Sequence, residues 1–461
     1  MQNPNLALKV FRMYHLWVLC FVILLVILLL LILGLKDSII AATATISTLY
    51  LADLIFNLRL VLSSLHNPGS IKVTSDELKK EREWPTYTVF CPLYKESAIL
   101  NQFVEAMTKI DYPIDKMTIM LLLEEDDEDT INAARNLTLP KNFITTVVPD
   151  SLPKTKPKAC NYGLMLAQSE YAVIFDAEDI PDTDQLKKAV LAFENTPANI
   201  ACLQAKLNFY NPSQNILTRL FTQEYSLWFN LILVGLQNFK GPVPLGGTSN
   251  HFRSAVLKSL GGWDPYNVTE DCDLGMRLFK QGFYTGMLDS YTLEEANSQL
   301  QNWMRQRSRW IKGYMQTLLV HTGKGRSVKR KKFDFHNLTF HLVVSGKIFT
   351  LFVNPLMILM TITYFIARGL VGSTIKSVYP APVFYMALIT LLAGNFLYVY
   401  YYILGCIDRR NWSLIKYAVF IPIYWLLMSL AGSIGLYQLL VKPHYWEKTI
   451  HGLHLTKETN V

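Results

Sequence analysis

Three acidic side chains fall within four residues of the stretch Val268–Gly282, at Glu270, Asp271 and Asp273. An apolar-periodic run follows them directly, so they stand where a helix is expected to begin. Acids in a first helical turn interact favourably with the helix dipole, and the stretch alone favours this capping interpretation. The alternative is chemistry, because a carboxylate can accept a proton from a hydroxyl group that attacks a substrate. The rest of the chain has to decide between the two.

Two further acidic clusters come directly after strand-like segments. Met117–Leu123 runs into the acids of Glu124–Thr130, and Tyr171–Ile174 runs into those of Phe175–Asp182. In a parallel sheet the carboxyl ends of the strands meet at one edge, where ligands bind. Each cluster alone could be a solvated loop, but two at one edge would repel an anion unless a divalent cation lay between them. Mg²⁺ and Mn²⁺ take carboxylate oxygens and bridge to substrate phosphates, so a nucleoside diphosphate with a metal would fit.

Basic residues near these acids also suit phosphate. Lys154, Lys156 and Lys158 alternate just before a predicted helix, and both lysine side chains and helix N-termini favour phosphate groups. A solvated basic loop is the alternative interpretation of these three lysines.

The segment Asn302–Thr317 combines aromatic and basic residues at helical spacing. Trp310 belongs to an aromatic stripe, and Gln306 and Arg309 share a neighbouring face. Such a helix, placed just before apolar spans, suits a membrane interface, and an anchor helix is the simpler interpretation. Arg309 could also neutralise a leaving diphosphate, because a guanidinium group matches phosphate with two parallel hydrogen bonds.

Alternating strands and helices must position these groups. Strand-like segments alternate with helical patterns near residues 97–109, 128–136, 157–168 and 183–194, which predicts a mostly parallel sheet with helices on both faces. The predicted strands are Tyr87–Tyr94, Met117–Leu123, Ile144–Val148, Tyr171–Asp176 and Ile200–Lys206.

The composition indicates a soluble part joined to membrane helices. The chain has 461 residues, of which 51% are hydrophobic, which is too apolar for an ordinary soluble enzyme and too charged for a pure membrane bundle. Three spans after the enzyme would put the tail on the opposite side of the membrane, yet the lysines of the tail favour the cytoplasm. A re-entrant or broken span, at Pro355 for example, would resolve this conflict. The candidate spans are Leu16–Leu35, Ser38–Leu62, Leu342–Ile366, Pro382–Cys406 and Ile415–Val441.

Charge and cysteine usage narrow the class of protein further. The net charge is +8, and the basic cluster Gly323–Lys332 precedes an apolar region, which suits anionic lipid better than nucleic acid. Within this cluster Arg326 and Arg330 have the R-x-x-x-R spacing of cyclic-di-GMP sensor domains, but they are interpreted as juxtamembrane charge. The six cysteines show no paired or regular spacing, so neither a zinc site nor a disulfide framework is predicted and a reducing compartment is favoured.

Several short motifs occur together in a familiar order. DAED (Asp176–Asp179), TED (Thr269–Asp271) and QRSRW (Gln306–Trp310), between flanking spans, resemble the membrane-bound family 2 glycosyltransferases of the cellulose, chitin and hyaluronan synthase type. A narrower resemblance is to the glycosyltransferase domain of bacterial phage-adsorption-protein-B proteins. It rests on CPLYKE (Cys91–Glu96), PLGGTSNHFR (Pro244–Arg253) and KPHYWEKTIHG (Lys442–Gly452). The resemblance extends over nearly the whole chain.

The resemblance implies an α/β GT-A domain with a mostly parallel sheet, transmembrane helices and amphipathic interface helices. The implied organisation is an N-terminal transmembrane hairpin over 1–65, a cytosolic GT-A domain over 66–295, interface helices with the Q-x-x-R-W motif and a basic loop over 296–335, transmembrane helices over 336–441 and a tail over 442–461.

The resemblance also implies roles for individual residues. Asp271 corresponds to the catalytic base, and Asp176 to the first acid of a metal motif that Glu178 or Asp179 would complete with Mg²⁺ or Mn²⁺. The implied nucleotide-sugar-binding residues are Glu96, Glu124, Asp126, Lys158, Asn161 and Arg309. The residues implied near the acceptor are Thr248, Asn250, Glu270, Gln306 and Trp310.

The expected activity is inverting, metal-dependent transfer of a sugar, from a UDP-sugar in the first instance, to a growing polysaccharide. Processive synthesis coupled to export across a bacterial inner membrane is expected, with the enzyme domain in the cytosol. Envelope export proteins and cyclic-di-GMP-sensing proteins are candidate partners, and no nucleic acid is expected. One alternative is a single transfer to a polyprenyl phosphate or glycolipid. A membrane scaffold with a degenerate enzyme domain and a transporter are less favoured alternatives.

Overall fold

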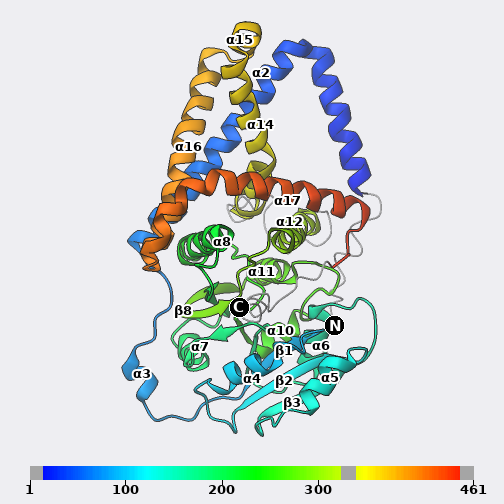
Figure 1. Cartoon of the computed structure of the whole chain (residues 1–461), viewed down its shortest axis with the longest axis vertical. Coiled ribbons are helices and arrows are strands. Elements are labelled where there is room, and N and C mark those ends of the chain that lie inside the picture. Colours follow the sequence, from blue (N-terminus) through cyan, green and yellow to red (C-terminus); the bar gives the residue numbers. More distant parts are fainter. Residues whose placement is uncertain (1–13, 323–338, 447–461) are drawn as a thin grey trace, which may run out of the picture.

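An eight-stranded sheet forms the centre of one half of the molecule, and long helices extend from the other half (Figure 1). The structure is a computed structural model, and it describes residues 14–322 and 339–446. The strands are β1 Tyr87–Leu93, β2 Met117–Glu124, β3 Phe143–Val148, β4 Tyr171–Ile174, β5 Ile180–Pro181, β6 Ile200–Phe209, β7 Asn250–Arg253 and β8 Tyr284–Glu294.

The sheet is mostly parallel, as the sequence predicts. Its strand order is β3-β2-β1-β4-β7-β6-β8-β5. The strands β3, β2, β1 and β4 run parallel, and β6 and β8 run parallel to each other, whereas β7 is antiparallel to both of its neighbours. All five predicted strands are confirmed. The strands β5, β7 and β8 are additional to the prediction.

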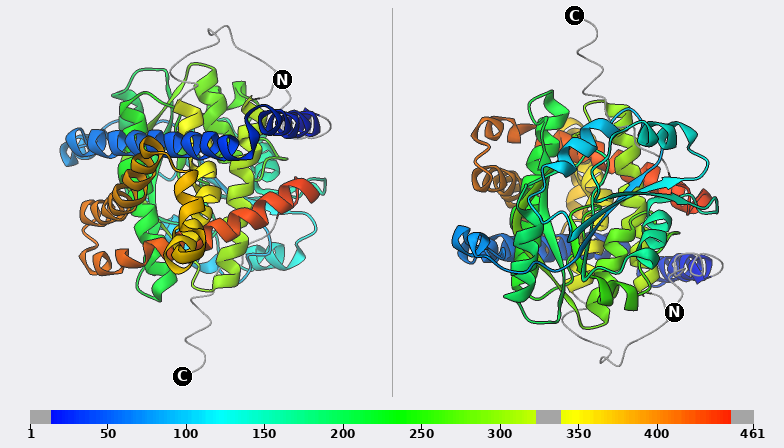
Figure 2. Two further views of the ribbon diagram at one scale, coloured as in Figure 1. Left: turned by 90° about the horizontal axis from the view of Figure 1, so that it is seen from above. Right: turned by 90° about the horizontal axis from the view of Figure 1, so that it is seen from below.

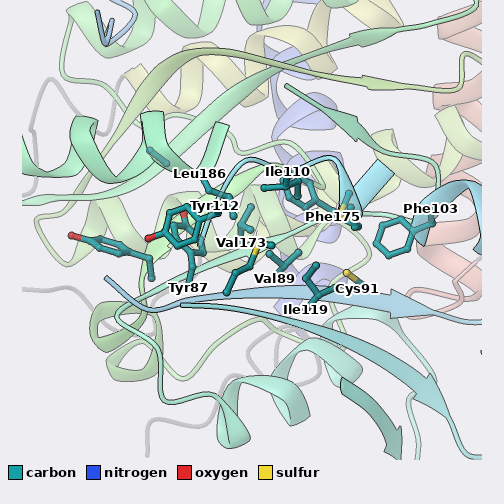
Figure 3. Close-up of a cluster of buried hydrophobic side chains, with 14 of the residues drawn as sticks. Tyr87, Val89, Cys91, Phe103, Ile110, Tyr112, Ile119, Val173, Phe175 and Leu186 are labelled. Atoms are coloured by element: carbon teal, nitrogen blue, oxygen red, sulfur yellow. The ribbon is translucent and has the colours of Figure 1, made fainter. Parts of the chain in front are cut away.

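Helices cover both faces of the sheet, which explains why its central strands are almost wholly apolar. The buried side chains of β1, β2 and β4 pack against α4 and α7 on one face, where Val89, Phe103 and Leu186 lie together (Figure 3). On the other face Phe90 and Leu122 pack against α6 and α11. The helices of this domain are α3 Ser75–Lys79, α4 Leu100–Thr108, α5 Glu128–Arg135, α6 Lys156–Leu166, α7 Gln185–Glu194, α10 Ser254–Ser259 and α11 Glu270–Lys280.

A second group of helices lies between the sheet and the long apolar helices (Figure 1). It consists of α8 Ile216–Leu227, the π-helical turn η1 Trp228–Ile232, α9 Leu233–Asn238 and α12 Leu300–Thr322. A partly buried ion pair joins two of them, because Arg307 of α12 donates to both carboxylate oxygens of Glu224 of α8. The hydroxyl of Tyr424 donates to the same carboxylate over 2.6 Å.

The long helices are strongly apolar on their exposed surfaces. Among the described residues, four helices are long and apolar enough to cross a membrane. In α2 the chain reverses near Gly34, whose φ of 74° breaks the helix into two arms of a hairpin (Figure 1). The elements are α2 Tyr14–His66, η2 His341–Ser345, α14 Gly346–Ile366, α15 Arg368–Ser377, α16 Ala381–Asp408, η3 Trp412–Phe420 and α17 Ile421–Val441.

The last apolar helix, α17, lies crosswise to α2, α14 and α16 and rests on α12, as the side view and the view from above agree (Figures 1 and 2). Its composition suits a span, as predicted, but its direction does not follow the others. The chain after α17 therefore returns to the enzyme half, where His444 lies against Tyr266. Residues 442–446 thus lie on the enzyme side of the apolar helices, and α14 continues through Pro355 without a break.

The contact between α17 and α12 depends on a glycine. A Cβ atom added to Gly435 would lie only 2.7 Å from the backbone oxygen of Ser308. We therefore expect Gly435→Ala to destabilise the protein by about 1–3 kcal/mol, which is the usual cost of overpacking. Gly369→Ala in α15 is the matched control, because a Cβ there meets nothing within 4 Å. Thermal unfolding of both variants in detergent checks this, and equal melting temperatures for them would contradict the close packing.

Candidate active site

Three acidic residues stand at the carboxyl edge of the sheet. Glu124 ends β2, Asp176 follows β4, and Glu294 ends β8. All three line one cavity of about 400 Å³. Strand direction explains why these three strand ends meet. The strand β7 is antiparallel to both β4 and β6, so β4 and β6 run parallel to each other, and β8 runs parallel to β6.

The turn after β4 separates the roles of its acids. Asp179 is buried, and its carboxylate accepts hydrogen bonds from the Asp176 backbone N–H over 2.6 Å and from the Thr248 hydroxyl. Asp176 and Glu178 instead line the cavity. Asp179 therefore braces the turn that presents the other two carboxylates.

Helix α11 directs its first acids to different surroundings. Asp271 and Glu270 line the cavity, whereas Asp273 is wholly buried and binds Arg277 over 2.7 Å and His321 over 2.9 Å. Side chains two positions apart on a helix point to nearly opposite sides, which explains why Asp271 and Asp273 have different surroundings. Asp271 accepts a hydrogen bond from the backbone N–H of Cys272 over 2.6 Å. The helix begins as the capping interpretation predicts, although the hydroxyl of Thr269 makes no capping bond.

Burial raises the pKa of both Glu270 and Asp271, and the charge of Asp271 raises the pKa of Glu270 further. The cations Lys156 and Arg309 oppose this rise and favour the ionised forms. A carboxylate whose pKa lies above its ordinary range is a better proton acceptor near neutral pH. Asp271 therefore combines a place in the wall of the cavity with a raised pKa.

Three alternating lysines are divided among three carboxylates. Lys154 binds Asp126 over 2.5 Å, Lys158 binds Glu124 over 2.5 Å, and Lys156 binds Asp176. Lys156 also donates to the backbone oxygen of Gly247 over 2.7 Å. All three lysines therefore form ion pairs with acids at the carboxyl edge of the sheet, and they do not form a solvated basic loop.

Helix α12 supplies the wall of the cavity that faces the apolar helices. Gln306, Arg309 and Trp310 all line it. The side chain of Gln306 accepts a hydrogen bond from Asn297 over 2.9 Å. The guanidinium group of Arg309 lies 4.4 Å from the centre of the Trp446 ring, which the returning tail brings to the same cavity.

Most of the predicted site residues meet at this cavity. Those in its wall are Glu96, Glu124, Asp176, Glu178, Thr248, Glu270, Asp271, Gln306, Arg309 and Trp310. Those outside its wall are Asp126, Lys158, Asp179, Asn161 and Asn250. The side chains of the last two bind backbone groups, since Asn161 pairs with Trp263 over 2.8 and 2.9 Å and Asn250 donates to Gly246 over 2.6 Å.

Other residues of the wall carry little signal in the sequence. The sequence does not indicate Glu294, because the mixed composition of β8 does not predict a strand there. It presents Lys156 only as one of three alternating lysines, and Trp446 only as part of a motif. Tyr225 and Trp228 lie in a region without a recognised motif, and only the fold brings them to the cavity.

The acids of the cavity are compatible with a metal that is shared with a ligand. Within the described ranges, no group of three or more His, Cys, Asp and Glu side chains could hold a metal ion. Asp176 and Glu178 can offer two carboxylates, and Mg²⁺ usually completes its shell with phosphate oxygens and water. The residues therefore fit a divalent ion that arrives with a diphosphate.

The fold and the site together define a class of enzyme. Glycosyl transferase family group 2 matches residues 171–441, which is more than half of the chain. The chain therefore belongs to this family, and the predicted enzyme class is confirmed.

Three curated relatives agree with this membership. The probable glycosyltransferase YdaM of Bacillus subtilis is 24% identical over 55% of this chain and 61% of the relative. The probable glucomannan 4-β-mannosyltransferase 3 of Arabidopsis thaliana is 26% identical over 64% of this chain and 55% of the relative. Cellulose synthase 2 of Novacetimonas hansenii is 27% identical over 51% of this chain and 15% of the relative. The chain thus spans less than two thirds of the length of these relatives. The narrower resemblance to phage-adsorption-protein-B proteins stays a prediction.

A solved structure confirms the predicted GT-A type of fold. The mannosyltransferase PcManGT of Pyrobaculum calidifontis, solved in complex with GDP-Man and Mn²⁺, has a TM-score of 0.52 to this chain. The likeness covers 87% of this chain and 99% of that one, at 17% identity. It extends beyond the sheet, since the match covers most of the chain.

Proposed function

We propose that this protein is an inverting, metal-dependent glycosyltransferase that adds sugars from a nucleotide-sugar to a growing polysaccharide, processively and with export of the product. The observation that carries the proposal is the shape of the cavity. It begins at Asp176 and Asp271 and continues to Lys347 and Leu351 of α14 and Met428 of α17. An acceptor chain leaving Asp271 would therefore enter the region of the apolar helices.

The lining of the middle of this cavity suits a carbohydrate. Five aromatic side chains lie between the acids and the apolar helices, and aromatic rings combine a large apolar face with polar edges. Such rings can stack on the C–H faces of sugars, while the hydroxyl groups of the sugars find polar partners. The five residues are Tyr225, Trp228, Phe229, Trp310 and Tyr314.

In the proposed mechanism Asp271 accepts the proton of the acceptor hydroxyl as that oxygen attacks the anomeric carbon of the donor. The bond from that carbon to the diphosphate breaks in the same displacement, so the configuration inverts. Arg309 and Lys156 lie where they can take up the charge of the departing diphosphate. A divalent ion held by Asp176 and Glu178 would supply further charge neutralisation.

The metal and the donor class receive support from the same sources. PcManGT was solved with GDP-Man and Mn²⁺, and the acids of this cavity fit such a shared ion. We propose a nucleotide-sugar with Mg²⁺ or Mn²⁺ for this chain, with a UDP-sugar tested first.

The proposed location is the inner membrane of a bacterium, with the enzyme domain in the cytosol, where nucleotide-sugars are made. Both arms of α2 and the returning tail are consistent with this, since they begin and end on the enzyme side (Figure 1). Envelope export proteins remain the proposed partners. The basic cluster at 323–332, which includes Arg326 and Arg330, lies outside the described residues, and so a cyclic-di-GMP-sensing partner is proposed on the sequence alone.

A second function is favoured by one observation. Lys347 lies at the membrane end of the cavity, with its amine 3.3 Å from the centre of the Trp228 ring. A cation at that depth could meet the phosphate of a polyprenyl phosphate acceptor. The enzyme would then add one sugar to a lipid and release it.

The test is product analysis on the purified full chain in lipid nanodiscs. A panel of UDP- and GDP-sugars is supplied with Mg²⁺ or Mn²⁺, and the released nucleoside diphosphate and the length of the product are measured. We expect one donor to give chains that lengthen with time. A single added sugar on a lipid would select the second function, and no diphosphate release from any donor would contradict both.

A further inference from the structure

The lysine closest to the catalytic acids is not the one that the family motif selects. The motif lysine, Lys158, is paired with Glu124 and lies outside the wall of the cavity. Lys156 lies in that wall, donates to Asp176 and to the backbone oxygen of Gly247, and is only 15% exposed. Its position needs an explanation of its own.

Lys156 stands between the proposed metal-binding acid and the proposed base. A Cβ atom added to Gly247 would lie 3.5 Å from Oδ2 of Asp271 and 3.8 Å from Nζ of Lys156. The ammonium group is thus bonded to Asp176 and faces the same small space as Asp271. Glycine leaves this space open, because any larger residue would project toward both groups.

The surroundings favour a positive charge at this position. The ammonium group of Lys156 is bonded to the carboxylate of Asp176, and the carboxylates of Glu270 and Asp271 line the same cavity. Acids gathered in a mostly buried cavity require a neighbouring positive charge. Lys156 provides that charge from within the chain.

We propose that Lys156 is a built-in counter-ion, whose ammonium group occupies the carboxylate of Asp176 until a divalent ion arrives together with the donor. A carboxylate oxygen that is bonded to an ammonium group is a poor ligand for a second cation. Within the described residues no cluster of acids offers a metal enough ligands to displace the lysine unaided.

The donor changes this balance. Its diphosphate supplies oxygen ligands for the metal. It also offers the ammonium group of Lys156 a second anionic partner, which the flexible lysine side chain can reach by a short movement. Metal binding should therefore depend on the donor, and the empty enzyme should bind metal weakly. This inference rests on the proposed function only in the identity of the diphosphate.

The test compares Mn²⁺ binding by variants of Lys156 through calorimetric titration of the purified full chain in detergent, with and without UDP or GDP. Lys156→Met removes the charge, and Lys156→Gln removes it while keeping a donor for Gly247. We expect both neutral variants to bind Mn²⁺ without nucleotide about tenfold more tightly than the natural protein, because a competing charge within a few Å is gone. Lys156→Arg keeps the charge and should bind Mn²⁺ as weakly as the natural protein.

The matched control is Lys187→Met. Lys187 pairs with Asp111 over 2.6 Å and is 17% exposed, but it lies on α7 and outside the cavity. Its loss should leave Mn²⁺ binding unchanged. Thermal melting identifies which variants are folded, and the comparison uses those.

Mn²⁺ affinity in the folded neutral variants that is equal to or weaker than that of the natural protein would overturn the inference. Equally tight Mn²⁺ binding by the natural protein with and without nucleotide would overturn it as well. Neither measurement needs sugar transfer, so a failure of the proposed function would appear separately, as the absence of donor turnover by the natural protein.

Discussion

Asp271→Asn should lower the rate of sugar transfer by about 10²–10⁴-fold and leave donor binding nearly unchanged, because the loss of a general base has costs of this size. Asparagine has the shape of aspartate and can still accept the hydrogen bond from the backbone N–H of Cys272, so the start of α11 should persist. The amide cannot take a proton from the acceptor. Transfer rates and equilibrium binding of the nucleoside diphosphate to the same preparation measure the two effects.

The matched control for this variant is Asp129→Asn. Asp129 also lies in the first turn of a helix, but it is exposed on α5 and outside the cavity. Its replacement should leave transfer unchanged. An Asp271→Asn enzyme that turns over at the natural rate would remove Asp271 from the mechanism, whatever the control does.

Asp176→Asn should weaken metal-dependent binding of the nucleoside diphosphate and lower transfer by about 10²–10³-fold, because it removes a charged ligand from the proposed metal site. The mechanism predicts a defect in donor binding here, in contrast to the defect in chemistry expected for Asp271→Asn. Fluorescence or calorimetric titration with UDP or GDP, in the presence and absence of Mn²⁺, separates the two.

Asp115→Asn serves as the control for this second variant, since Asp115 is exposed and lies outside the cavity. Unchanged Mn²⁺ dependence of nucleotide binding in Asp176→Asn would show that the metal is held elsewhere or is not used.

The parts of the fold that could be predicted are those with local signals. The runs that form β1, β2 and β4 are apolar because both faces of the sheet are covered, and helical patterns separate them. The acids at the ends of β2 and β4 could then be placed at one edge from strand direction alone. Asp271 required the motif context, because a cluster of acids at a helix start, taken alone, favours capping.

The strands that escaped prediction are stabilised by pairing at long range. The four residues of β7 carry three polar side chains, Asn250, His251 and Arg253, and form a strand because β4 and β6 flank them. The longer β8 mixes polar and apolar residues and pairs with β6 through two register shifts. Glu294 could not be assigned to the site without that strand.

The direction of α17 is a further property that composition cannot supply. Apolar side chains indicate burial in lipid or protein, but they do not fix how a helix lies. Here Gly435 allows the helix to approach the backbone of α12, and Ser429 donates to the backbone oxygen of Leu351 over 2.6 Å. The contact of Lys156 with Asp176 also could not be predicted from composition, because only the folded chain shows which of the three lysines reaches Asp176.

The anomeric configuration of the first sugar that the purified enzyme transfers is the most direct test of the mechanism. NMR of the product, made from a donor of known α configuration, reports it from the coupling of the anomeric proton. A single displacement assisted by Asp271 predicts a β-linked product. An α-linked product would require two displacements or a different geometry, and it would contradict the role proposed for Asp271.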